Sequence, residues 1–115
     1  MTAECKRGDI FLVNWNPARG SEQAGIRPAV VIQNDIGNTY SPTTIVAACS
    51  ASITRSFPFI VRISARDSGL DRDTAVNLAQ IMTIGKDRLE KKIGRMTAKK
   101  MTELDAAIAN SLGLS

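Results

Sequence analysis

The chain has 115 residues, of which 43% are hydrophobic and 23% charged, so we expect a single domain over residues 1–115. A chain of this length hides roughly two thirds of the surface that its unfolded form exposes, which is enough for a core without metal or disulfide cross-links. No histidine occurs in the sequence. Its absence excludes mechanisms that need an imidazole as base, metal ligand or pH switch, including the Ser-His-Asp and Cys-His triads.

The charge is mildly basic and unevenly placed. The net charge is +4 and the isoelectric point is about 9.4. Residues 50–66 carry three arginines and no acid, and residues 86–100 hold seven bases against Asp87 and Glu90. A basic surface of this kind favours the binding of polyanions such as nucleic acid. Basic residues alone, however, more often belong to a solvated surface that binds nothing.

The two cysteines, Cys5 and Cys49, are far apart and form no C-x-x-C motif, so neither a metal site nor a redox pair is indicated. We expect Cys49 to act as a small buried hydrophobic residue. The first residues lack an apolar signal core, and no apolar run approaches the ~18 residues of a membrane span. These features favour a cytoplasmic protein with no membrane partner.

Short β-rich runs bounded by Gly, Pro, Asn, Asp or Ser predict a mostly antiparallel sheet. The runs are Ile10–Trp15, Ala29–Gln33, Thr44–Cys49, Phe59–Ser64, Thr74–Leu78 and Ile81–Ile84. The segment 34–41 has the composition of a turn-rich connector. The segment 91–96 fits a last strand or a helical turn equally well.

A helical pattern begins at Ala98. Met101, Leu104, Ile108 and Leu112 fall on one stripe, as in an amphipathic helix. Thr97 is a candidate N-cap, Met96 and Met101 have the spacing of a hydrophobic staple, and Gly113 is a candidate end. Because short twisted strands tend to close, we expect a mainly β fold, a small barrel with a docked C-terminal helix.

Three polar segments are candidates for chemistry, each with a plainer alternative. The first, residues 20–28, is a long connection with Arg27 immediately before Pro28 at its base. An arginine in such a place is more often a surface ion-pair partner than a catalytic residue. The second, residues 49–52, places Ser50 at a strand end, where hydroxyls usually bond to turn backbone. The third, residues 55–59, sets Arg55 beside aromatics that would stack on a base or pack on the core.

Considered together, these segments carry a family resemblance. Its strongest motif is Gly-Ser-Glu-Gln-Ala-Gly-Ile-Arg-Pro over residues 20–28. Further matches are Arg7-Gly8-Asp9-Ile10, Asn16-Pro17, Gln33-Asn34-Asp35, Ser41-Pro42-Thr43, Phe57-Pro58-Phe59, Gln80-Ile81, Thr83-Ile84 and Ser111-Leu112-Gly113. Over nearly its whole length the chain resembles the MazF/PemK family of toxin endoribonucleases.

The resemblance implies a small SH3-like barrel of the MazF/CcdB type. It also implies a type II toxin that cleaves single-stranded RNA, especially messenger RNA, at specific sequences without a metal or other cofactor. In that reaction the ribose 2′-hydroxyl attacks the adjacent phosphate, leaving a 2′,3′-cyclic phosphate and a 5′-hydroxyl. The expected partners are a second copy of the chain and a cognate, MazE-like antitoxin that occupies the RNA groove.

The resemblance implies three catalytic positions. The family's catalytic arginine corresponds to Arg27, and its catalytic hydroxyl, often a threonine, corresponds to Ser50. An acidic residue proposed as a base in some members corresponds to Glu22. The positions implied in RNA binding are Ser21, Gln23, Asn34, Arg55, Phe57, Pro58 and Gln80. Ala79 replaces an acidic residue of close relatives, which bears on the cleavage sequence more than on the activity.

Two other functions fit a similar fold. One is a CcdB-like poison of gyrase that acts without catalysis through its C-terminal helix, and it needs neither Arg27 nor the 20–27 segment. The other is a basic RNA-binding module whose site has degenerated, which Ser50 and Ala79 would suit. RNA cleavage by the purified protein distinguishes the ribonuclease from both alternatives.

Overall fold

The computed structural model describes residues 4–16 and 25–114. Within them the chain forms one six-stranded antiparallel sheet, ordered β4-β5-β3-β2-β1-β6. The strands are β1 (Asp9–Asn14), β2 (Ile26–Val31), β3 (Thr43–Ser50), β4 (Ile60–Ile63), β5 (Thr74–Gly85) and β6 (Leu89–Arg95). The helices are α1 (Asp35–Tyr40), α2 (Ala65–Ser68) and α3 (Ala98–Ser111), with a 3₁₀ turn, η1 (Lys86–Arg88). The predicted mainly β fold with a C-terminal helix is confirmed.

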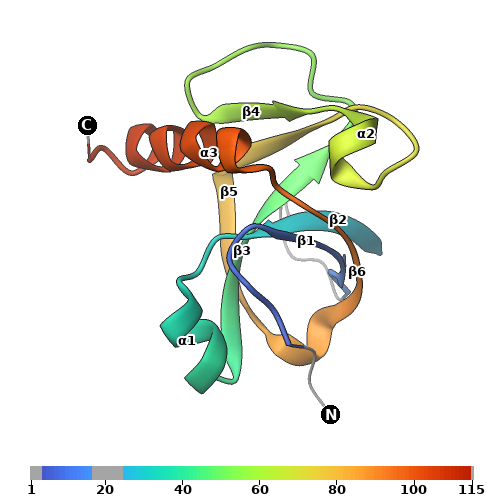
Figure 1. Ribbon diagram of the computed structural model, residues 1–115, viewed down its shortest axis with the longest axis vertical. Coiled ribbons are helices and arrows are strands. Elements are labelled where there is room, and N and C mark those ends of the chain that lie inside the picture. Colours follow the sequence, from blue (N-terminus) through green and yellow to red (C-terminus); the bar gives the residue numbers. More distant parts are fainter. Residues whose placement is uncertain (1–3, 17–24, 115) are drawn as a thin grey trace.

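The sheet curls into a barrel-like shape but is not closed by strand pairing (Figure 1). In the described residues β4 and β6 remain its two ends, and the turn after α2 packs against β6. A Cβ on Gly94 would lie 2.2 Å from the Ser68 carbonyl oxygen, and one on Gly69 would lie 1.8 Å from the Ile93 carbonyl oxygen. Glycine at both positions therefore lets α2 cover the free edge of β6, which protects it from unwanted pairing.

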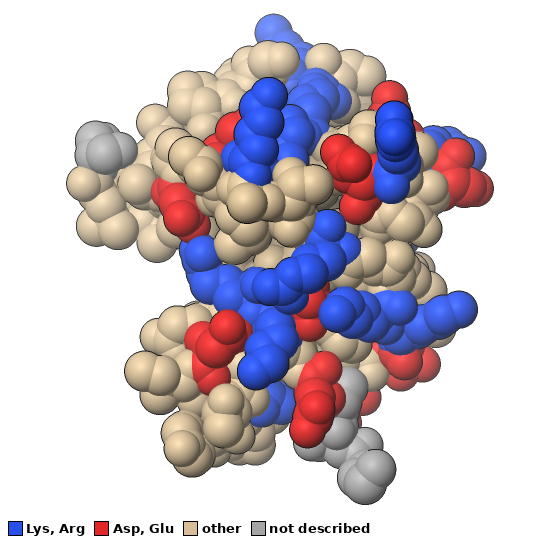
Figure 2. Space-filling view, viewed as in Figure 1, with Lys and Arg blue, Asp and Glu red and all other residues tan. Residues whose placement is uncertain are grey.

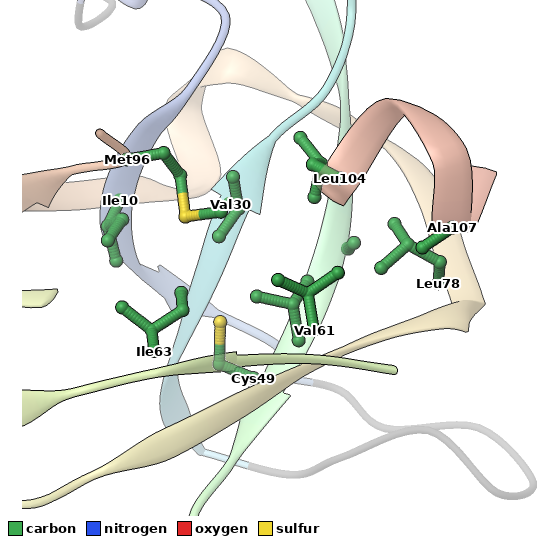
Figure 3. Packing of buried hydrophobic residues seen from close by; sticks show 11 residues of the cluster. Ile10, Val30, Cys49, Val61, Ile63, Leu78, Met96, Leu104 and Ala107 are labelled. Atoms are coloured by element: carbon green, nitrogen blue, oxygen red, sulfur yellow. The ribbon is translucent and has the colours of Figure 1, made fainter. Parts of the chain in front are cut away.

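The core lies on both faces of the sheet. Along β1, Ile10 belongs to one buried cluster, whereas Phe11 and Val13 belong to another, as the two-residue period of a strand requires. Helix α3 covers the first cluster: Figure 3 shows Leu104 and Ala107 on the helix side facing the strands. Because the curled sheet buries both faces, its strands are apolar on both sides.

Helix α3 begins where the sequence predicts. The Thr97 hydroxyl accepts a hydrogen bond from the Lys100 amide at 3.1 Å, and Met96 and Met101 pack in the same cluster. The apolar stripe of the helix is one turn shorter than predicted, because Leu112, its last predicted member, is 52% exposed. The helix ends at Ser111, and Gly113 takes a left-handed φ of 72°, which stops the helix.

Other expectations need correction. The segment 34–41 is not a simple connector, because it holds α1. For the segment 91–96, where a strand and a helical turn fitted equally well, the structure shows the strand, since residues 89–95 form β6. The two runs between 74 and 84 form one long strand, β5, with a register shift against β3. Neither α2 nor η1 was predicted.

Candidate active site

Arg27 is held by the backbone near the start of β2. It lies opposite Val13 of β1, and the buried Trp15 indole donates to the Arg27 carbonyl oxygen at 3.3 Å. The following residue, Pro28, stiffens the chain. These contacts fix the Arg27 backbone while its side chain lies at the surface.

Ser50 ends the neighbouring strand β3. In the register of β2 and β3, Ala29 pairs with Ala48, and Arg27 and Ser50 each lie two residues beyond this pair, at the same end of the two strands. Both residues line one hollow of about 260 Å³. The structure therefore brings together two of the predicted site residues from separate strands.

The Ser50 hydroxyl also bonds within its own turn. Its oxygen lies 2.8 Å from the Ser52 hydroxyl oxygen and accepts from the Ser52 amide at 3.2 Å. This is the turn-forming role that strand-end hydroxyls usually have. Because Ser50 accepts from the amide through a lone pair, its O–H remains able to donate to a phosphate oxygen in place of the Ser52 hydroxyl.

Sequence reasoning missed two residues of this hollow, Asp71 and Arg72. They lie in the loop between α2 and β5, distant in sequence from Arg27 and from Ser50. The only signal available was the charged run of residues 71–73, and a charged run usually indicates a solvated loop. Two guanidinium groups and one carboxylate give the hollow a net positive charge, which suits a phosphate.

Cys49 adjoins Ser50 but is not a nucleophile. Burial raises the pKa of its thiol to about 12, so the thiol stays protonated at neutral pH. Figure 3 shows its sulfur pointing into the core near Val61 and Ile63. The prediction that Cys49 is a small buried hydrophobic residue is confirmed.

The loop between β3 and β4 carries three of the predicted RNA-binding residues. The Arg55 guanidinium carbon lies 5.8 Å from the centre of the Phe57 ring, and this ring stacks on Phe59 at 5.1 Å. Phe57 is 44% exposed, and Pro58 is exposed beside it. An exposed aromatic ring with a cation over it suits a stacking contact better than a place in the core.

Gln80 is exposed on β5, within the register shift that separates the pairs Ala48–Asn77 and Ala47–Ile81. The Leu78 amide donates to the Phe59 carbonyl oxygen at 2.9 Å, so this bend adjoins the aromatic loop. Because a register shift changes the direction of the side chains within it, this shift sets the direction of the Gln80 side chain.

Asn34 lies at the opposite end of β2 from Arg27, where its side chain caps α1 by accepting from the Gly37 amide at 2.8 Å. The structure does not bring it to the Arg27 hollow. Glu22, Ser21 and Gln23 lie outside the described residues.

Most bases of the segment 86–100 bond within the chain. Lys92 and Arg95 both contact the buried carboxylate of Asp9, at 3.2 Å and 2.7 Å. Lys86 is buried, Arg88 donates to the carbonyl oxygens of Asn14 and Asn16, and Lys100 pairs with Glu103. Figure 2 shows Lys and Arg crossing the middle of one face with acidic side chains among them. Three of these bases thus lie beside a carboxylate, and two of the three share the same one.

Comparison with known proteins agrees with this geometry. The family model described as "PemK-like, MazF-like toxin of type II toxin-antitoxin system" matches residues 6–112. The chain belongs to this family. It is 48% identical over 110 residues to an "Endoribonuclease MazF" of Staphylococcus saprophyticus, an alignment that covers 95% of this chain and 92% of the relative.

Solved structures share the fold of this MazF/PemK-family chain. An endoribonuclease in complex with its cognate antitoxin from a mycobacterial species superposes with a TM-score of 0.81 at 24% identity, covering 96% of this chain and 97% of the other. MazF from Deinococcus radiodurans superposes with a TM-score of 0.78 at 21% identity, covering 96% and 98%. In the described residues, no helix is long and apolar enough to cross a membrane.

Proposed function

We propose that this toxin endoribonuclease cleaves single-stranded RNA, messenger RNA above all, at selected sequences, with the Arg27–Ser50 hollow as its reaction centre. The observation that carries the proposal is that two strands bring the arginine and the hydroxyl of the family motif into one hollow. Residues 1–115 act as one toxin domain.

In the proposed reaction the ribose 2′-oxygen attacks the adjacent phosphorus and the bond to the 5′-oxygen breaks. The products are a 2′,3′-cyclic phosphate and a 5′-hydroxyl. Negative charge grows on the phosphate oxygens in the transition state, and the Arg27 guanidinium is suited to bind them through two parallel hydrogen bonds. Ser50 donates to one of the same oxygens.

Proton transfer needs other groups, because an arginine is always protonated and a serine hydroxyl is a poor base at neutral pH. We assign removal of the 2′-hydroxyl proton to Glu22 or to solvent. The 5′-oxygen takes a proton from water. Because the substrate supplies its own nucleophile, the rate depends mainly on aligning the 2′-oxygen with the leaving 5′-oxygen, which a histidine-free site can do.

Single-stranded RNA suits the surroundings of the hollow. Unstacked bases are free to stack on Phe57, while the Arg55 side chain adds a cation beside it. Pro58 and Gln80 extend this surface, and Ser21 and Gln23 belong to the same set proposed to contact RNA. Asn34, also in this set, lies at the opposite end of β2 and so would contact RNA away from the hollow. An A-form duplex would keep its base edges hidden and its 2′-oxygens out of line.

We further propose that the chain works as a homodimer in the cytoplasm, without a cofactor, and that a cognate MazE-like antitoxin blocks it by occupying the RNA groove. Activity in excess EDTA supports the metal-free reaction, and its loss contradicts it.

The deciding experiment incubates a defined RNA pool with the purified protein and maps the new 5′-hydroxyl ends. We expect sequence-selective cleavage by the parent protein and a loss of at least about 10²-fold with Arg27→Ala, since one charge-stabilising donor contributes that much. Arg66→Ala, at an exposed position outside the hollow, is the matched control. Undiminished cleavage by the Arg27 variant contradicts the site, and salt-dependent RNA binding by the parent with no product favours a non-catalytic module.

A further inference from the structure

A second, larger hollow lies next to the reaction centre. It measures about 520 Å³, within the roughly 300–1,000 Å³ typical of small-molecule sites. Ala51 and Thr74 line both hollows, so they form a common wall. Any RNA whose phosphate contacts Arg27 therefore has an adjacent nucleotide within reach of the second hollow.

The charges of this second hollow balance. Its lining contains Arg62 and Lys100 against Asp67 and Asp73. A phosphate gains little from a site without net charge, whereas an uncharged base offers donors and acceptors that such a site can bind. Of the other lining residues, the half-buried Ile53 provides apolar surface for the face of a base, whereas Ile63 is almost wholly buried.

Hydrogen bonds hold the walls in place. The Ser64 hydroxyl accepts from the Asp67 amide at 3.2 Å, and an Asp73 carboxylate oxygen accepts from the Ala65 amide at 2.8 Å. These two hydrogen bonds hold the short helix α2 at its N-cap and in its first turn. A rigid wall favours selective binding, because the protein loses less conformational entropy when the ligand binds.

Arg62 fixes the opposite wall. From β4 its guanidinium donates to the Ile53 carbonyl oxygen at 2.5 Å and to the Arg55 carbonyl oxygen at 3.0 Å. Both acceptors belong to the loop that carries Arg55 and Phe57 toward the RNA. One side chain therefore shapes the second hollow and positions the proposed RNA-contacting loop.

We infer that the second hollow is a base-binding subsite for a nucleotide next to the scissile phosphate, with Asp67 as its reader and Arg62 as the positioning residue. A carboxylate only accepts hydrogen bonds, so it favours the bases that present an amino group, which are cytosine, adenine and guanine, over uracil. This inference rests on the proposed function and adds to it a residue for sequence selection.

The test measures cleavage of a randomised single-stranded RNA pool by the parent, Asp67→Asn and Arg66→Ala proteins, with 5′-hydroxyl ends sequenced. The asparagine keeps the size of Asp67 but adds an amide donor. We expect its preference for bases with an amino group over uracil at one flanking position to fall by about tenfold, while Arg66→Ala keeps the parent pattern. An unchanged preference at every position in Asp67→Asn overturns the subsite.

Kinetics on one good substrate test the role of Arg62. Because its bonds place the loop rather than contact the reacting atoms, Arg62→Ala should raise KM several-fold with a smaller change in kcat, and Arg62→Lys should restore part of the loss. A fall in kcat at unchanged KM overturns this role. Thermal unfolding of each variant shows that it is folded, and an active Arg27→Ala protein would reject the reaction centre independently of the subsite.

Discussion

At the scale of single residues, Ser50 is the informative position. Its hydroxyl already bonds to the Ser52 turn, so catalysis requires the O–H to turn toward the phosphate. We predict that Ser50→Ala lowers kcat by about 10²-fold, the typical loss of one transition-state donor. Ser50→Thr should retain activity, because it keeps the hydroxyl and its methyl narrows the choice of rotamers. Single-turnover cleavage of a defined RNA measures both, and a fully active alanine variant would assign the donor role to another group.

Arg27 and Ser50 were predicted because the family resemblance carries each of them, Arg27 within the motif of residues 20–28 and Ser50 by its position at the end of an apolar strand. The sequence could not predict Asp71 and Arg72 in the same hollow, because their approach depends on how the loop after α2 folds back on the sheet. The role of Arg62 could not be predicted from the sequence either. Its two bonds go to backbone carbonyl oxygens of a loop, and such contacts leave no pattern in residue types.

At the scale of elements, α1 and α3 show what makes a helix predictable. Helix α3 has a capping residue, an apolar stripe and a terminal glycine, all readable from the sequence. Helix α1 contains Gly37 and Asn38, which are weak helix formers, and is held by contacts from elsewhere. Buried Asn38 accepts from the Thr44 hydroxyl at 2.7 Å and donates to the Gln33 carbonyl oxygen at 2.9 Å.

The start of α1 gives a prediction about acid. The Arg7 backbone amide donates to the Asp35 carboxylate at 2.7 Å, and this bond, followed by one from Asn38, lowers the pKa of Asp35. A lowered pKa stabilises the fold above the ordinary aspartate value of about 4, and the stabilisation is lost as pH falls through the folded-state value. Asp35→Asn should therefore be less stable than the parent at pH 6, by under about 1 kcal/mol for so exposed a group. Urea unfolding should show this difference shrinking below pH 4, and a difference independent of pH would contradict the assignment.

At the scale of the whole molecule, the net charge of +4 gives a poor measure of how many phosphates the protein contacts. Lys92 and Arg95 share the carboxylate of Asp9 on the β6 side of the sheet. Arg27 and Arg72 line the hollow proposed for the phosphate, where Arg72 also lies 3.9 Å from Asp71, and Arg55 lies on the aromatic loop. We therefore predict about three phosphate contacts and, at roughly 0.7 per phosphate for single strands, a slope near −2 for log K against log salt.

Variants separate these charges. Arg72→Ala should reduce the magnitude of that slope by about 0.7, since it removes one phosphate contact. Lys92→Ala should leave the slope nearly unchanged, because Lys92 lies on β6 and does not line the hollow proposed for the phosphate. Binding of an uncleavable RNA with 2′-deoxy substitution at the cut site, measured from low to moderate salt, separates affinity from chemistry. If the Lys92 variant changed the slope as much as the Arg72 variant, RNA would lie along the face of β6 and not across the end of β2 and β3.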